Sequence, residues 1–158
     1  MTDRRASRRH LLLLLCAGAL PATRARAETA LPRPVSLAAA ARSAAARDEP
    51  LVLLVSLPGC PYCEQVRRSH LAPLERQGAS VWQLDIGSLA AVIDFDGTRR
   101  SHDAVISALG ARFAPTVLFL GARGEELGER LVGAGIPDFY GAMLEERLQL
   151  ARARTARR

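Results

Sequence analysis

The chain has 158 residues, of which 49% are hydrophobic and 24% are charged, so its length fits one globular domain and its composition excludes an intrinsically disordered protein. A formal charge of +6 would suit a nucleic-acid-binding protein, but the charge lies at the two ends. Residues 1–27 carry six arginines against one acid, and residues 152–158 carry four more arginines. The intervening chain is net acidic, so we expect no nucleic-acid partner.

Residues 1–27 have the order of an export signal. Arginines precede an apolar run over residues 11–20, and a small-x-small cleavage site (Ala-Arg-Ala) follows at residues 25–27. The apolar run is too short to span a bilayer core of ~30 Å as a helix. Residues 7–12 (Ser-Arg-Arg-His-Leu-Leu) resemble a twin-arginine signal, with an ordinary secretory signal as the alternative. Cleavage after Ala27 would give a periplasmic protein with two cysteines.

The mature chain predicts alternating helices and strands. Residues 28–50 indicate an extended arm followed by a helix that Ser36 caps. The apolar runs at residues 51–57 and 116–120 predict central strands covered on both faces. Pro73 should bend or interrupt the helix that precedes it. Further strands are expected at residues 80–86, 92–95 and 126–132, and further helices at residues 60–70, 101–110 and from Pro137 onward.

This order of elements predicts the α/β class. Parallel strands with helical crossovers, followed by a hairpin and a closing helix, give a central mixed β-sheet with helices on both faces. We expect one domain over residues 51–151 and a flexible basic tail over residues 152–158, which lack apolar partners. The apolar stripe of the closing helix is expected to comprise Phe139, Tyr140, Met143, Leu144 and Leu148.

Two cysteines three residues apart, Cys60-Pro61-Tyr62-Cys63, follow the first apolar run and a Pro-Gly turn. At the start of a helix, the first sulfur would lie beside unpaired backbone N–H groups and the positive end of the helix dipole, which favours a thiolate. The second sulfur would lie one turn further in. The spacing predicts a dithiol that cycles with a disulfide, with Cys60 as the nucleophile and Cys63 as the resolving thiol.

Other roles for the two cysteines remain open. A structural zinc site needs four ligands, which only His70 and His102 could complete, and we expect His102 on a helix surface. A copper carrier using Cys60, Cys63 and His70 is a stronger alternative, although His70 would lie roughly 10 Å from Cys63 along a continuous helix. A structural disulfide over so short a loop would remove little chain entropy. We expect neither a metal nor another cofactor.

The chain resembles the thioredoxin superfamily, and most closely the exported thioredoxin-like reductases with a C-P-Y-C centre. The resemblance rests on residues 51–63, on Phe-Ala-Pro-Thr at residues 113–116 and on residues 133–139. It implies a three-layer thioredoxin-like fold, a cis peptide before Pro115, and a substrate strand paired with the backbone of Ala114. It therefore assigns substrate binding to Pro61, Tyr62, Ala114 and Pro115.

The chain departs from this family in three places. Gly59 stands where thioredoxins have a tryptophan, and Leu54 stands where they bury an aspartate that moves protons for the second thiol. Glu64 is the acid that we consider for that transfer. Glutaredoxins share C-P-Y-C but continue from their proline into a Gly-Gly turn, whereas this chain continues into apolar residues, so glutathione is not expected. Residues 86–100 are additional to a minimal thioredoxin.

These features predict an exported thiol–disulfide oxidoreductase that reduces disulfides in periplasmic proteins. Its expected partners are disulfide-containing exported proteins and a membrane electron donor, and we expect a monomer. Tyr62 lacks the cation that a histidine brings to that position in strongly oxidising enzymes, which favours a reductant of moderate potential. A copper carrier and a disulfide-forming oxidase are the alternatives.

Overall fold

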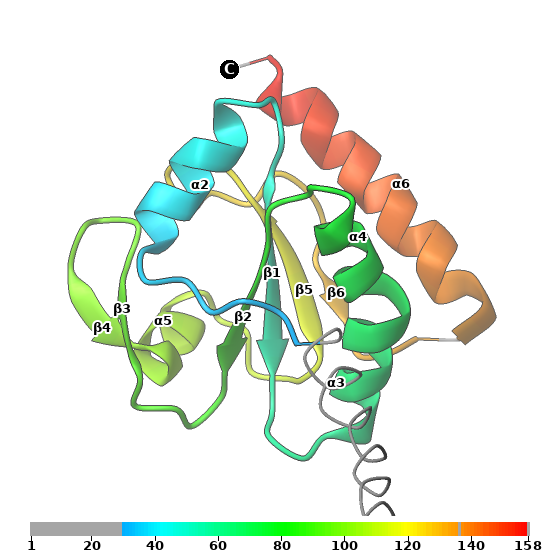
Figure 1. The fold of residues 1–158 in the computed structure, drawn as a ribbon, viewed down its shortest axis with the longest axis horizontal. Helices are drawn as coiled ribbons and strands as arrows, with labels where there is room; N and C mark the ends of the chain where they lie inside the picture. The colour runs from blue at the N-terminus through cyan, green and yellow to red at the C-terminus, as the bar shows by residue number, and fades with distance from the viewer. Residues whose placement is uncertain (1–29, 136, 158) are drawn as a thin grey trace, which may run out of the picture.

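The computed structural model describes residues 30–135 and 137–157 (Figure 1). The expected export signal at residues 1–27 lies outside these ranges and stays a prediction. None of the helices within the described ranges combines the length and the hydropathy needed to cross a bilayer.

A four-stranded mixed sheet of order β2-β1-β5-β6 forms the centre of the molecule (Figure 1). Strand β1 (Leu51–Ser56) pairs in parallel with β2 (Val81–Asp85) and antiparallel with β5 (Thr116–Leu120), which in turn pairs with β6 (Leu131–Val132). Every residue of β1 and β5 is buried. The prediction of two central strands covered on both faces is confirmed.

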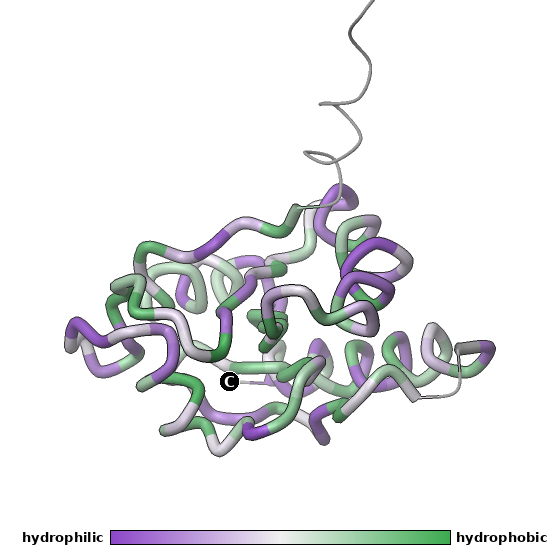
Figure 2. The backbone as a smooth tube through the Cα atoms, turned by 90° about the horizontal axis from the view of Figure 1, so that it is seen from below, coloured by the Kyte–Doolittle hydropathy of each residue, from purple (hydrophilic) through white to green (hydrophobic). Residues whose placement is uncertain are grey.

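Helices cover both faces of this sheet and make three layers (Figure 1). On one face lie α2 (Leu37–Ala45) and α5 (His102–Ala108), and on the other lie α3 (Pro61–Val66), α4 (Ala72–Arg76) and α6 (Pro137–Thr155). Figure 2 shows helices that alternate between hydrophilic and hydrophobic segments, as expected when one side of a helix packs on a sheet. The predicted fold class is confirmed.

Serine hydroxyls begin two of these helices, because a side-chain oxygen satisfies a backbone N–H that has no partner in the first turn. Ser36 accepts a hydrogen bond from the N–H of Ala39 at the start of α2. Ser101 accepts one from the N–H of Ala104 at the start of α5. Both caps lie where the sequence predicts them.

The segment over residues 86–100 contributes to a small second sheet rather than one strand. Strand β3 (Ala91–Ile93) pairs antiparallel with β4 (Arg99–Ser101), and Gly97 supplies a positive φ of 83° in the turn between them. The last strand of the main sheet is shorter than the predicted residues 126–132, because only Leu131–Val132 pairs continuously with β5.

The helix that carries the two cysteines continues past Pro73 to Arg76. A π-helical turn, η1 (Arg67–Leu71), joins α3 to α4, and the N–H of Ala72 donates to the carbonyl of Arg67. Pro73 comes directly after this wide turn and has no N–H to donate. The predicted interruption is therefore a local widening that also places Arg67 at the start of the turn.

The prediction of a flexible tail over residues 152–158 is wrong for its first part, because α6 runs to Thr155. Arg152 Nε lies 2.9 and 3.0 Å from the two carboxylate oxygens of Glu49. Arg154 donates to the carbonyl of Leu127 at 2.7 Å. These arginines fix the end of the helix to the body of the domain.

The apolar stripe of α6 is also narrower than predicted. Phe139 is 62% exposed and Met143 is 40% exposed, so neither belongs to the core. The helix residues that do enter the core are Tyr140, Leu144, Leu148 and Ala151.

Candidate active site

Cys60 lies between the end of β1 and the start of α3. It is the N-cap residue of α3, with extended backbone angles, and its Sγ accepts a hydrogen bond from the N–H of Cys63 at 3.1 Å. Pro61 occupies the first turn, where it has no hydrogen bond to lose. Gly59 adopts a φ of 75°, which lets the chain turn sharply from the strand into the helix.

Cys63 lies one turn further along and is fully buried, whereas Cys60 is half-buried. Burial and a hydrogen bond with Cys60 raise the pKa of the Cys63 thiol, while hydrogen bonds with the Leu57 backbone and the Ser56 side chain act in the opposite direction. Both cysteines are free thiols. The pair thus offers one accessible sulfur and one enclosed sulfur.

The segment before β5 lies at the same edge of the sheet as the cysteines, because Val55 near the end of β1 pairs with Thr116 at the start of β5. The Ala114–Pro115 peptide bond is cis, the isomer that the resemblance implies. Phe113 is 70% exposed on one side of this bond, and Tyr62 between the cysteines is 63% exposed. Substrate binding by these residues stays a prediction.

A cavity of about 490 Å³ opens beside Cys60. Its walls come from the N-terminal arm, the end of β1, the start of α3 and the end of β2. The polar side chains in its lining are Arg33, Ser56, Cys60, Glu64, Arg67, Gln83 and Asp85.

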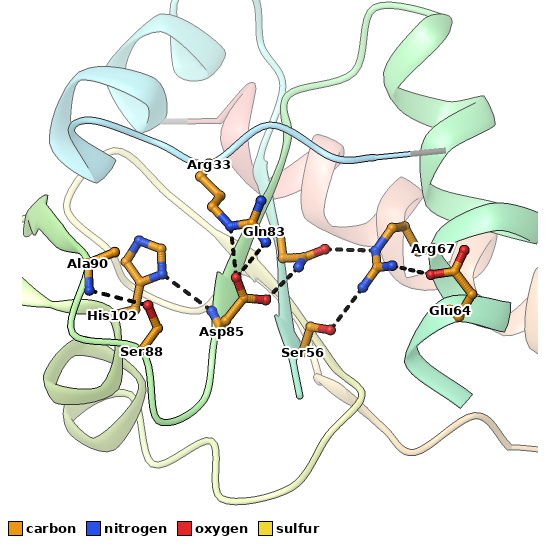
Figure 3. A network of polar contacts seen from close by, with 9 residues as sticks. All are labelled: Arg33, Ser56, Glu64, Arg67, Gln83, Asp85, Ser88, Ala90 and His102. Carbon is orange, nitrogen blue, oxygen red and sulfur yellow. Dashed lines mark hydrogen bonds and ion pairs between the residues drawn. The ribbon is translucent and has the colours of Figure 1, made fainter. Parts of the chain in front are cut away.

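Arg67 is the centre of a polar network in this wall (Figure 3). Its guanidinium donates to Ser56 Oγ at 3.1 Å and to Gln83 Oε1 at 2.8 Å, and it forms an ion pair with Glu64. Glu64, which we considered for proton transfer, therefore pairs with Arg67. The side chains that shift the pKa of the Cys63 thiol are those of Cys60, which raises it, and Ser56, which lowers it.

Asp85 extends the network along β2 (Figure 3). Its carboxylate accepts a hydrogen bond from Gln83 Nε2 at 2.6 Å and forms an ion pair with Arg33 at 2.7 Å. Its backbone N–H donates to Nδ1 of His102 at 3.4 Å. His102 is only 2% exposed, so the expectation of a surface histidine is wrong.

Sequence patterns did not identify Ser56, Arg67 and Asp85 as neighbours of the two cysteines. A usable signal was present in β2, where Gln83 and Asp85 interrupt an otherwise apolar strand. Both face the side of the sheet that carries the cysteines, because Leu54 pairs with Gln83 and Ser56 with Asp85 in the parallel register. Two buried polar groups on one face of a strand need partners from the elements packed on it.

No group of three or more His, Cys, Asp or Glu side chains over residues 30–135 and 137–157 is arranged to hold a metal ion. His70 instead packs its ring against Tyr140, with the ring centroids 5.0 Å apart. The three-ligand copper site of Cys60, Cys63 and His70 is therefore not formed.

Residues 37–147 match the family model described as a thioredoxin-like domain, and the chain belongs to this family. The chain keeps a Cys-x-x-Cys pair at Cys60 and Cys63 within that domain. None of the curated proteins is significantly similar to it.

Solved structures of thioredoxin-fold proteins are similar to this chain. Thioredoxin NaTrxh from Nicotiana alata is 19% identical with a TM-score of 0.45, and the match covers 75% of this chain and 96% of that one. The C-terminal domain of Neisseria meningitidis DsbD is 20% identical with a TM-score of 0.48, over 75% of this chain and 99% of that one. The periplasmic thioredoxin SoxS from Paracoccus pantotrophus is 25% identical with a TM-score of 0.42, over 65% and 99%.

Proposed function

We propose that the chain is an exported thiol–disulfide oxidoreductase that reduces disulfides in periplasmic proteins. The observation that carries this proposal is the contrast between the two sulfurs. Cys60 caps a helix, is half-buried and accepts a hydrogen bond from the N–H of Cys63, whereas Cys63 is fully buried. An accessible attacking sulfur with an enclosed second sulfur one turn away is what dithiol exchange requires.

The reaction consists of two displacements. The Cys60 thiolate attacks one sulfur of the substrate disulfide, a mixed disulfide forms, and the other substrate sulfur leaves as a thiolate. Cys63 then loses its proton and attacks the Cys60 sulfur. The bond to the substrate breaks, the substrate leaves fully reduced, and Cys60 and Cys63 become a disulfide. A dithiol donor in the membrane supplies the two electrons that restore the pair.

Substrate docking falls to the exposed groups at the same edge of the sheet. Tyr62 and Phe113 offer exposed aromatic surface, and Pro61 lies beside the attacking sulfur. Ala114 and Pro115 lie directly before β5, and the peptide bond between them is cis. We propose that an extended substrate segment pairs with the backbone of Ala114 and places its disulfide at Cys60.

Reduction of insulin disulfides by the mature chain, starting at Glu28, tests this function. Cys60→Ser should reduce turnover to the uncatalysed rate, because no attacking sulfur remains, and His70→Ala should keep it. Cys63→Ser should accumulate partners as mixed disulfides on Cys60. A wild-type protein with no turnover that binds Cu(I) tightly and stoichiometrically would instead support the copper carrier. Recovery of the protein from the periplasm with Glu28 at its N-terminus would test export.

A further inference from the structure

Ser56 lies on the face of β1 against which the cysteine helix packs. It is the last residue of β1, is 1% exposed, and lowers the pKa of the Cys63 thiol. Arg67 Nη2 donates to Ser56 Oγ at 3.1 Å. A guanidinium has donors and no acceptor, so it occupies a lone pair of Oγ and leaves the hydroxyl hydrogen for another partner. Cys63 lies one helical turn before Arg67, on the same face of the cysteine helix, and its thiol is the group whose pKa Ser56 lowers.

Two other side chains also hold the guanidinium group of Arg67. Its Nε donates to Gln83 Oε1 at 2.8 Å, and its Nη1 pairs with the carboxylate of Glu64 (Figure 3). Gln83 is fixed in turn, because its Nε2 donates to Asp85 at 2.6 Å. The position of the Ser56 hydroxyl therefore depends on contacts that extend into β2.

The second displacement needs a thiolate at Cys63, and burial opposes that charge. Burial raises the pKa of the Cys63 thiol, and the hydrogen bond with Ser56 acts against this rise. At the position where thioredoxins bury an aspartate, this chain has Leu54, which is 0% exposed. Leu54 and Ser56 are two residues apart on one strand and so lie on the same face. The charge on the sulfur needs a donor that Leu54 cannot supply.

We propose that Ser56 is a catalytic residue of the second displacement, donating a hydrogen bond to the Cys63 thiolate while Arg67 positions its hydroxyl group. This inference rests on the proposed function. The proton of Cys63 passes to water in the cavity that Ser56 and Glu64 line. As the Cys60–Cys63 bond forms, the bond to the substrate breaks, and the released substrate thiolate takes its proton from solvent.

Single-turnover reaction of the reduced mature chain with an aromatic disulfide separates the two displacements. Attack by Cys60 releases one coloured aryl thiolate, and attack by Cys63 releases the second. Ser56→Ala should slow the second release roughly tenfold, the size of one hydrogen bond to a charged group, and leave the first unchanged. The pH profile of the second release should move to higher pH. The groups that shift the pKa of Cys63 are Cys60, Leu57 and Ser56, and the charged Arg67 and Glu64 lie beyond Ser56.

Two further variants make the test specific. Ser56→Thr keeps a hydroxyl group and should restore the second release. Ser80→Ala removes another buried hydroxyl, which accepts from Trp82 rather than from a cysteine, and should leave both releases unchanged. Arg67→Met should slow the second release in the same direction, and it carries the test if Ser56→Ala does not fold.

The outcomes separate this inference from the function on which it rests. Equal rates of the second release in wild type and Ser56→Ala, or equal slowing of both releases, would overturn the role of Ser56 alone. A wild-type protein that releases only one thiolate, as Cys63→Ser must, would overturn the proposed function itself.

Discussion

Strands β1 and β2 pack against the same layer of helices but present different kinds of side chain to it. From Leu51 to Val55, β1 is apolar and every side chain is buried. Strand β2 presents Gln83 and Asp85 to the face on which the cysteine helix packs, and both are less than a tenth exposed. Both groups have partners from outside the strand. Arg33 neutralises Asp85, and Arg67 donates a hydrogen bond to Gln83.

The difference shows that polar groups beside the two cysteines come from the neighbouring strand as well as from the strand that leads into the cysteine helix. Neighbouring strands lie about 4.8 Å apart, so a side chain on β2 can serve a site at the end of β1. Here Leu54 lies beside Gln83 and Ser56 lies beside Asp85 in the register. Strand β1 keeps an apolar core position at Leu54 and contributes Ser56 at its end, and β2 supplies Gln83 and Asp85.

The largest effect on the free energy of unfolding is expected when a carboxylate replaces the Leu54 side chain. Leu54→Asp should lower the free energy of unfolding by about 3–5 kcal/mol, because the site is fully buried and an aspartate there would lose its hydration. Gln83, its neighbour on β2, already donates to Asp85 and accepts from Arg67. Urea unfolding at neutral pH measures the loss.

Leu54→Asn is the matched control, since asparagine has nearly the same shape as aspartate and carries no charge. The asparagine variant should be the more stable of the two at neutral pH. Burial raises the folded-state pKa of the new aspartate above its unfolded value, so the gap should close as pH falls to about 4 and widen as pH rises. If both variants kept wild-type stability, the apolar character of β1 would be incidental.

A smaller effect is expected at the polar end of β2. Asp85→Asn should cost about 1–3 kcal/mol, because an amide cannot accept from both Gln83 and Arg33 and places a donor against a donor. The same urea titration provides the measurement. Arg33→Ala should cost less than about 1 kcal/mol, since the Arg33 side chain is 55% exposed and its ion pair is partly solvated.

The double variant completes this test. A coupling energy below about 1 kcal/mol between Asp85 and Arg33 would place most of the Asp85 effect in its contact with Gln83. If Arg33→Ala cost as much as Asp85→Asn, the arm rather than β2 would be the main support of the network.

Most of the fold follows from local patterns in the sequence. The apolar runs of β1 and β5 predict strands covered on both faces, and serines before α2 and α5 mark where those helices begin. The position of the two cysteines at the start of α3 also follows from the local sequence. These features depend on residues that are close together along the chain.

The rest depends on contacts between distant segments. Arg67 and Asp85 become neighbours of the two cysteines only when β2 and the arm pack against the cysteine helix. The end of α6 stays helical because Arg152 meets Glu49, which lies 103 residues earlier. His102, at the start of a helix, gave no local sign that the backbone of Asp85 would donate to its ring. No periodicity predicts such pairings.

The smallest expected effect is a change of the free energy of unfolding with pH. It has one contribution from His102, beside β2, and one from His70, on the cysteine helix. Burial lowers the pKa of His102 below its usual 6.5, with Asp85 opposing and Arg33 adding to the shift; burial lowers the pKa of His70 as well. Both rings are therefore neutral in the fold at pH values where the unfolded chain already takes up protons. The free energy of unfolding should be constant above pH 6.5 on this account and fall as pH drops below it.

The variant His102→Asn identifies the contribution of the β2 region, because an asparagine oxygen can accept from the Asp85 N–H without titrating. It should lower stability at neutral pH and reduce the acid dependence below pH 6.5, leaving the part that belongs to His70. Thermal unfolding across this range measures both. An unchanged acid dependence in His102→Asn would show that the ring beside Asp85 accepts a proton in the fold as readily as in the unfolded chain. Such a result would mean that solvent reaches the polar groups at the end of β2 in the folded protein.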